Sequence, residues 1–261
     1  MGEVAHQQLV VLLGAGRVAT HLAPALLKAG YCIVQIYSRT IDSARALAEP
    51  LGIPYTDNLD AISTEAHIYI ACVADEALPA ITARVASADD DKIYLHTAGS
   101  VSMDVWRNVG AKHYGILYPL QTFSKEREVD MRKVSLFIEA SDASALQATE
   151  RLARGLSDKV YHADSAKRAQ LHIAAVFACN FTNAMYGIAH QLLEKHQLPF
   201  DVLLPLIDET AAKVHTLTPP EAQTGPAIRG DHEVMQRHMD ALAQTPELQR
   251  LYEQISHLIK P

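Results

Sequence analysis

Residues 9–19 read LVVLLGAGRVA, an apolar run that leads into two glycines and then into a segment with helical spacing. Gly14-x-Gly16-x-x-Ala19 in this setting fits the turn between a strand and a helix that binds a dinucleotide. Gly14 allows the tight turn, Gly16 lets a pyrophosphate approach the backbone, and Ala19 lets the helix pack close to the sheet. We expect the phosphates to meet the helix N-terminus at Gly14, Ala15, Gly16, Arg17 and Val18. The alternative is a glycine turn in another α/β fold.

Short apolar runs alternate with amphipathic segments as far as about residue 164, which is typical of strands linked by helices in a mostly parallel sheet. Gly30 and Gly52 act as stop signals for helices at 17–29 and 43–51. The pattern predicts a Rossmann-type, doubly wound α/β sheet with strands at 9–13, 32–37, 68–73, 93–96, 114–118, 136–139 and 160–162.

The character of the sequence changes after Asp164, because residues 165–196 contain no proline and three further helical segments follow. The helices are expected at 165–196, 200–216, 231–244 and 246–259. We therefore predict a dinucleotide-binding domain at 1–163 and an all-helical domain at 164–261. No linker-like composition separates them, so we expect the domains to pack together, with the site in a cleft between them.

Composition narrows the choice of partners. The 261 residues are 49% hydrophobic and 20% charged with a net charge of −7, which argues against a nucleic-acid or anionic-membrane surface. The three cysteines are far apart and indicate neither disulfides nor a zinc site. The thirteen histidines lack an H-E-x-x-H spacing, so no metal is expected. A polar N-terminus without a signal-peptide pattern favours a cytoplasmic protein that acts on a small molecule.

The second expected strand ends in Ser38, Arg39 and Thr40, without a carboxylate. An Asp or Glu there would bind the 2′-hydroxyl of NAD, whereas a guanidinium and hydroxyls suit the 2′-phosphate of NADP. NADP(H) is therefore the expected cofactor. The alternative is a solvent-facing arginine at the start of a loop.

Later strands end in groups that could line the nicotinamide side of the same crevice. The backbone of Val73 and Ala74 is expected there, and Asp75 is expected to cap the next helix. Thr97 could bind the nicotinamide carboxamide and Ser100 a substrate carboxylate, although either hydroxyl could equally satisfy only local backbone.

Two loops could supply contacts to a substrate. Residues 118–123 read YPLQTF and place Gln121 at the tip of a turn, as one wall of a site or as packing against the helical part. Residues 224–231 form a turn-rich loop in which Arg229 could reach an anionic substrate or remain a solvated charge. His96, in the middle of the chain's apolar runs, is expected to be an interior, hydrogen-bonded residue.

The first long helix of the second part carries a polar stripe. At 100° per residue, Arg168 lies about 40° from His172, Cys179 and Asn183 lie within about 20°, and Asn180 lies about 80° away. Hydride transfer to a carbonyl leaves an alkoxide that needs a proton, and a histidine is a suitable donor. His172 is the predicted acid–base residue, oriented by Asn180 and Asn183. The alternative is a buried cluster that bonds only to backbone.

Several motifs together resemble the Rossmann-like proteins that carry a DUF2520 helical domain, and the resemblance covers nearly the whole chain. It rests on GAGRVA at 14–19, HTAGS at 96–100, YPLQTF at 118–123, HIAAVFACN at 172–180 and TGP at 224–226. The layout is similar to pyrroline-5-carboxylate, ketopantoate and F420-dependent NADP reductases. The resemblance implies an NADP oxidoreductase with a 6-phosphogluconate-dehydrogenase-like helical domain that forms a homodimer. That family often has histidine where this chain has Tyr118.

These observations predict an NADPH-dependent reductase of a small oxo- or imino-acid, ketopantoate-like reduction being one concrete form. Two other hypotheses stay open. One is a non-catalytic NADP(H)-binding or sensing protein that uses its helical domain as a dimer and partner surface. The other keeps the enzyme but places a deazaflavin opposite NADP.

Overall fold

The computed structural model describes residues 8–88 and 92–259 of the chain. The chain forms two compact units, Met1–Asn183 and Ala184–Pro261. This division lies further along the chain than the expected boundary at 163/164, because the first helix beyond that boundary makes its side-chain bonds to the sheet unit. The assignment of cofactor and substrate roles to 1–163 and 164–261 stays a prediction.

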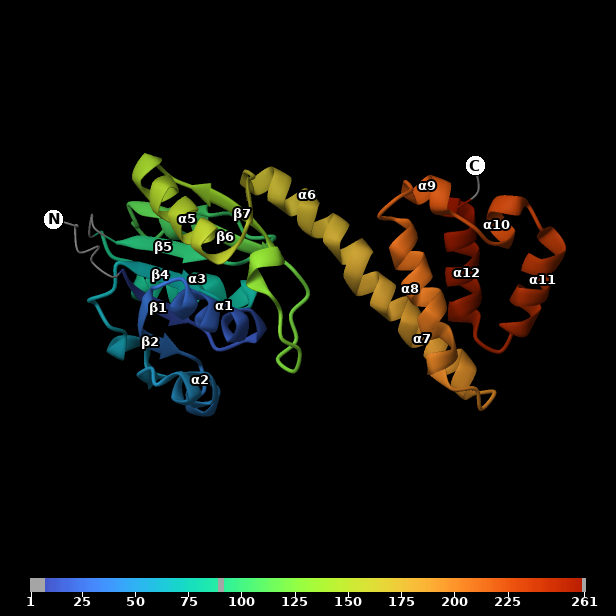
Figure 1. Ribbon diagram of the computed structural model, residues 1–261, viewed down its shortest axis with the longest axis horizontal. Coiled ribbons are helices and arrows are strands. Elements are labelled where there is room, and N and C mark those ends of the chain that lie inside the picture. The colour runs from blue at the N-terminus through green and yellow to red at the C-terminus, as the bar shows by residue number, and fades with distance from the viewer. Residues whose placement is uncertain (1–7, 89–91, 260–261) are drawn as a thin grey trace. The chain divides into compact units, whose positions relative to one another are not determined.

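A single sheet organises the first unit (Figure 1). Its order among the described residues is β3-β2-β1-β4-β5-β6-β7-β8. Neighbouring strands run parallel except β6 and β7, which are antiparallel. The order 3-2-1-4-5-6 is that of dinucleotide-binding sheets and confirms the predicted fold. The strands are β1 (Leu9–Leu13), β2 (Cys32–Tyr37), β3 (Tyr55–Thr56), β4 (Ile68–Ala71), β5 (Ile93–His96), β6 (His113–Leu120), β7 (Ser135–Ala140) and β8 (Lys159–His162).

Helices cover both faces of this sheet. Leu12 of β1 packs in one buried cluster with residues of α1 and α5, and Leu13 in a second cluster with residues of α3 and α4. Burial on both faces explains the near-continuous apolar runs of the central strands. The helices of this unit are α1 (Arg17–Lys28), α2 (Ile41–Ala48), α3 (Leu78–Val85), α4 (Asp104–Arg107), α5 (Ala143–Leu156) and α6 (Ser165–Ala175), with 3₁₀ turns η1 (Glu49–Leu51), η2 (Leu59–Ala61), η3 (Asp75–Ala77) and η4 (Met131–Lys133).

The second unit is helical, as the sequence predicts. Asp231 caps α11 by accepting a bond from the Val234 N–H, and α12 has the bounds expected from its pattern. The remaining elements are α7 (Thr182–Glu194), η6 (Phe200–Leu203), α8 (Leu204–Lys213), α9 (Pro219–Ala222), α10 (Pro226–Arg229), α11 (His232–Ala241) and α12 (Pro246–Ile259).

The long helical run from Ser165 to Glu194 is not uniform. A π-helical segment, η5 (Val176–Phe181), separates α6 from α7, and the Thr182 hydroxyl bonds to the Phe177 carbonyl five residues earlier. One 18-residue stretch within this run is apolar enough to span a membrane, judged by length and composition only. None of that stretch is buried.

Candidate functional site

Gly14 forms the turn after β1 and lies directly against the backbone of Cys72, at the end of the neighbouring strand β4. Its φ of +118° is one that side-chain-bearing residues rarely adopt. A Cβ at this position would lie nearer the Cys72 carbonyl oxygen than the 3.0 Å that real Cβ atoms keep. The Gly14 N–H donates to the Tyr37 carbonyl at 2.7 Å, so the turn is tied to the ends of both β2 and β4.

Gly16 has a different task, because the protein does not fill the space around it. Among the described residues, apart from its two chain neighbours, a Cβ there would have only Cys72 O within 4 Å, at 3.8 Å. Gly16 is the N-cap of α1 and supplies no side-chain cap, and the first turn of α1 contains no acidic residue. The N–H groups at this helix end are therefore available to an anion. Ala19 is fully buried beneath them, as the motif predicts.

The end of β2 offers a cation and hydroxyls beside this turn. Ser38 is tied to Thr56 by its N–H, whereas the Arg39 side chain is exposed and forms no ion pair within the described part of the chain. The Thr40 hydroxyl donates to the Ser43 hydroxyl at 2.8 Å at the start of α2. This set fits a phosphate on the adenosine ribose and contains no carboxylate that would repel it.

The ends of β4 and β5 meet at the same edge of the sheet. Val73 lies against Gly14, and Ala74 is exposed. The expectation that Asp75 caps a helix is wrong: the N-cap of η3 is Ala74, and Asp75 accepts a hydrogen bond from the Ser100 hydroxyl. Thr97 is buried, with its hydroxyl bonded to Ala71 O at 3.4 Å. The structure thus brings Ser100, but not the Thr97 hydroxyl, to the surface of this edge.

His172 lies at this edge and is paired with Tyr118. The Tyr118 hydroxyl is 3.1 Å from His172 Nδ1, and the two rings meet edge-on with centroids 6.1 Å apart. Gly99 makes room for both, since a Cβ there would lie 2.6 Å from His172 Nδ1 and 2.9 Å from Tyr118 Cζ. Within the described residues, His172 Nε2 has no hydrogen-bond partner.

Tyr118 of this pair and His96 of β5 have displaced pKa values. Burial raises the pKa of Tyr118, opposed by the Arg168 guanidinium, so the phenol stays protonated at neutral pH. Burial, with Arg168 as a second cause, lowers the pKa of His96 to about 4. His96 is fully buried, its Nδ1 accepting from the Ala98 N–H at 3.2 Å, which confirms it as an interior residue.

Comparison with known proteins agrees with the dinucleotide-binding fold described above. The model "NADP oxidoreductase coenzyme F420-dependent" matches residues 9–99, and "Domain of unknown function (DUF2520)" matches residues 134–259. A Bacteroides fragilis protein assigned as an NADP oxidoreductase is 49% identical, with a TM-score of 0.92 over 97% of this chain and 98% of that one. The chain belongs to this family of NADP oxidoreductases that carry a DUF2520 domain. The comparison with curated proteins gives no match.

More distant structures share the fold of this oxidoreductase. A 1-pyrroline-5-carboxylate reductase of Streptococcus pyogenes is 12% identical, with a TM-score of 0.66 over 97% of this chain and 98% of that one. An imine reductase of Myxococcus stipitatus, in complex with NADP⁺, is 16% identical, with a TM-score of 0.63 over 96% of this chain and 92% of that one.

Other predicted site residues of the oxidoreductase are not gathered at the pair. Asn180 and Asn183 are exposed and, in the described part of the chain, form no hydrogen bond with His172. Their predicted angles assumed an unbroken α-helix, whereas η5 closes with wider turns and shifts every later residue around the axis. Gln121 is exposed and accepts from the Thr122 N–H, and Arg229 ends α10 in the helical unit.

Two residues at the site escaped the sequence prediction. The sequence places Tyr118 at the end of an expected strand and the start of a loop but gives it no partner; the structure has it within β6, beside the end of buried β5. Glu139 of β7 binds Arg168 at 2.5 Å. The signal that could have found them is a polar or ionisable side chain at a position where a central strand should be apolar.

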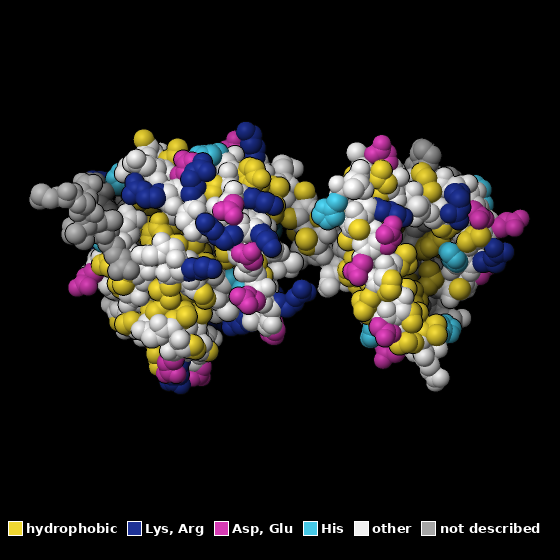
Figure 2. Space-filling model, in the orientation of Figure 1, with side chains coloured by type: hydrophobic (Ala, Val, Ile, Leu, Met, Phe, Trp, Pro, Cys, Tyr) yellow, Lys and Arg dark blue, Asp and Glu magenta, His cyan; other side chains and the backbone are white. Residues whose placement is uncertain are grey.

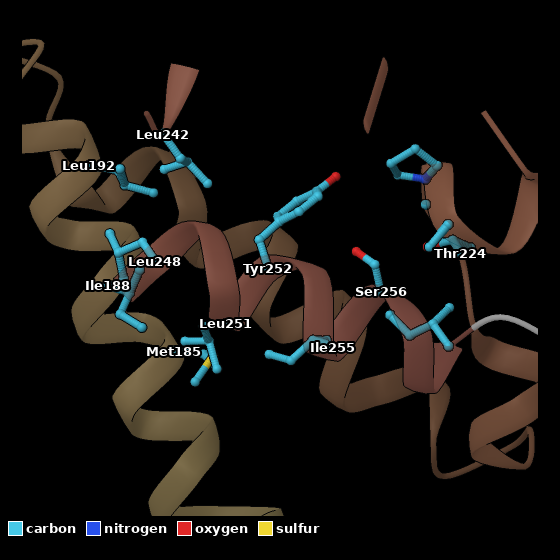
Figure 3. Close-up of a pocket in the computed structure, with 14 residues that line it drawn as sticks. Met185, Ile188, Leu192, Thr224, Leu242, Leu248, Leu251, Tyr252, Ile255 and Ser256 are labelled. Atoms are coloured by element: carbon cyan, nitrogen blue, oxygen red, sulfur yellow. The ribbon is translucent and has the colours of Figure 1, made fainter. Parts of the chain in front are cut away.

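The helical unit contains a separate apolar pocket of about 240 Å³ between α7, α10 and α12 (Figure 3). Met185, Ile188 and Leu251 point into it, and the side chains with hydroxyl groups that line it are those of Thr224, Tyr252 and Ser256. The Tyr252 hydroxyl is 2.9 Å from His238 Nδ1. This second Tyr–His pair belongs to the helical unit and not to the strand ends beside the Gly14 turn, so the reaction chemistry is sought at His172.

Proposed function

We propose that this oxidoreductase uses NADP(H) to reduce the C=N or C=O bond of a small imino- or oxo-acid, with His172 as the proton donor. The observation that carries the proposal is the Tyr118–His172 pair at the strand ends that also hold the Gly14 turn. Bound at that turn, NADPH would supply the hydride. The names of two distant structural neighbours, a 1-pyrroline-5-carboxylate reductase and an imine reductase, favour an imine over a ketone.

The fit of a dinucleotide rests on three features of this chain. Gly14 holds the turn against the Cys72 carbonyl, Gly16 leaves space beside the backbone, and the start of α1 is uncapped. Arg39, with Ser38 and Thr40, would hold the 2′-phosphate. These residues bind and orient, and none of them moves a proton.

Tyr118 decides which nitrogen of His172 transfers the proton. Its hydroxyl can accept from Nδ1–H of the imidazolium and also from Nδ1–H of the neutral ring that remains after Nε2 has given up its proton, so Nδ1 is occupied in both states. Nε2–H is then the proton that reaches the substrate oxygen or nitrogen as the carbon receives hydride. The neutral imidazole left behind regains its proton from solvent. Because burial raises the pKa of Tyr118, the phenol stays protonated at neutral pH and remains a hydrogen-bond partner of His172.

The test is hydride transfer from stereospecifically deuterated NADPH to a panel of cyclic imino acids and 2-oxo acids. We expect deuterium in one product and a fall in kcat of about 10²- to 10⁴-fold in His172→Asn, the range of general acid catalysis. The NADPH Kd of that variant should stay within about twofold. A folded His172→Asn enzyme with wild-type turnover would refute the role of His172. Turnover only with added reduced deazaflavin would place a second cofactor in the site.

We further propose that a second copy of the chain covers the exposed apolar helices, giving a homodimer. Large apolar side chains are solvent-exposed on α6, η5 and the helical unit (Figure 2), among them Ile173, Phe177, Leu206 and Val214. Light scattering should give the mass of two chains, and Leu206→Asp should shift it toward one. A monomer that binds anionic or neutral lipid vesicles would instead assign this surface to a membrane and oppose the expected cytoplasmic location.

A further inference from the structure

Arg168 is a buried cation one helical turn before His172. Its side chain is 1% exposed, and its guanidinium reaches two elements other than its own helix. One terminal nitrogen donates to Glu139 Oε2 at 2.5 Å in β7, and the other donates to the Val101 carbonyl at 2.5 Å. Val101 lies two residues after Gly99, the residue against which His172 packs.

Glu139, the partner of Arg168, also binds Ser165 at the start of α6. Its Oε1 accepts from the Ser165 N–H at 3.0 Å and its Oε2 from the Ser165 hydroxyl at 2.8 Å. The carboxylate therefore holds the first turn of α6 and the Arg168 side chain together. As a result α6 is fixed to β7 and to the 99–101 turn just before it presents His172.

The arrangement is costly by itself. Both charges are taken out of water, and Arg168 Nε is buried without a hydrogen-bond partner in the described residues. A buried ion pair is often no more stabilising than apolar residues of the same shape. A role in holding one geometry accounts for its presence better than stability does.

We propose that the Arg168–Glu139 pair is the positioning device of the reaction centre, which holds His172 against Gly99 and Tyr118 so that its Nε2 faces the substrate. The inference rests on the proposed function of His172. Neither Arg168 nor Glu139 exchanges a proton with the substrate in this scheme. Displacement of the donor by about 1 Å is enough to slow a reaction about 100-fold.

The experiment compares three full-length variants with the wild type. Arg168→Met with Glu139→Gln removes both charges, so that no unpaired ion is left buried, while the glutamine oxygen can still accept from Ser165. Arg168→Lys keeps the charge but cannot serve Glu139 and Val101 with a planar fork. Lys167→Met is the matched control, because Lys167 is the neighbouring cation on α6 and its pair with Asp164 is exposed.

The readouts are kcat and KM separately, NADPH affinity, and the side-chain ¹⁵N signals of His172. We expect the double variant to bind NADPH as the wild type does, to lose about 100-fold in kcat with little change in KM, and to show a His172 Nδ1 signal shifted toward that of free imidazole. Arg168→Lys should recover part of both changes. Lys167→Met should match the wild type.

A folded double variant with wild-type kcat and an unchanged His172 signal would overturn the proposal. If the double variant does not fold, Arg168→Lys decides in the same way. The His172 signal needs no substrate, so it tests positioning even when the wild type reduces nothing in the panel. A wild type that reduces nothing in the panel would refute the proposed function, whereas the comparison of His172 signals would still test the positioning role.

Discussion

Alanine substitutions at the two glycines of the first turn should have opposite consequences. Gly14→Ala places a Cβ on a backbone with φ +118° and into the Cys72 carbonyl. The conformational penalty is about 1–2 kcal/mol and the overpacking penalty about 1–3 kcal/mol. At roughly 2–4 °C per kcal/mol for a domain of this size, we expect the Tm to fall by roughly 10 °C.

Gly16→Ala should leave the fold intact and weaken the binding of the cofactor. The φ of −84° and ψ of −169° at Gly16 suit alanine, and the new Cβ would lie 3.8 Å from Cys72 O. Lower freedom of the unfolded chain should make the variant equal to the wild type or about 0.4–1 kcal/mol more stable. The methyl group would occupy the space where a pyrophosphate approaches, so we expect NADPH Kd to rise at least about tenfold, or about 1.4 kcal/mol.

Thermal unfolding with and without NADPH, together with a fluorescence titration, measures both effects. The expected pattern is a low Tm for Gly14→Ala and a normal Tm with little NADPH-induced stabilisation for Gly16→Ala. Wild-type NADPH affinity in Gly16→Ala would refute the assignment of the phosphates to this turn. A normal Tm in Gly14→Ala would refute the close approach to β4.

Two further predictions concern charge. Arg39→Asp should lower the affinity for NADPH about 10- to 100-fold, as expected for loss of a charge-assisted contact, and leave the affinity for NADH unchanged. Arg237→Asp is the control. Equal NADPH affinities of the two variants would contradict the 2′-phosphate assignment. Burial lowers the pKa of His96 to about 4, so the imidazole is neutral in the folded protein at neutral pH. Its contribution is complete above about pH 6.5 and is lost as the pH falls toward 4, on the order of 2–3 kcal/mol being gone at pH 4.5. Urea unfolding at pH 7 and 4.5 should show a smaller acid loss in His96→Gln, and an identical loss would count against the burial of a neutral imidazole.

Local sequence determined the first half of the fold. β1, the glycine turn and α1 have the predicted bounds to within one residue, and Gly30 and Gly52 adopt the positive φ expected after helix ends. These features depend on residues a few positions apart, whose backbone preferences and spacing are visible in the sequence. The two-residue strand β3 was missed, because so short a run has no alternation to read.

Only the tertiary structure decided which side chains lie together at the proposed reaction centre. Tyr118 meets His172 across 54 positions of sequence, and Glu139 meets Arg168 across 29. The sequence identified His172 but paired it with Asn180 and Asn183, since helical angles cannot anticipate a π turn such as η5. The partners of a side chain depend on which strand ends and helix turns pack together, and that packing is set by the whole core rather than by any local stretch.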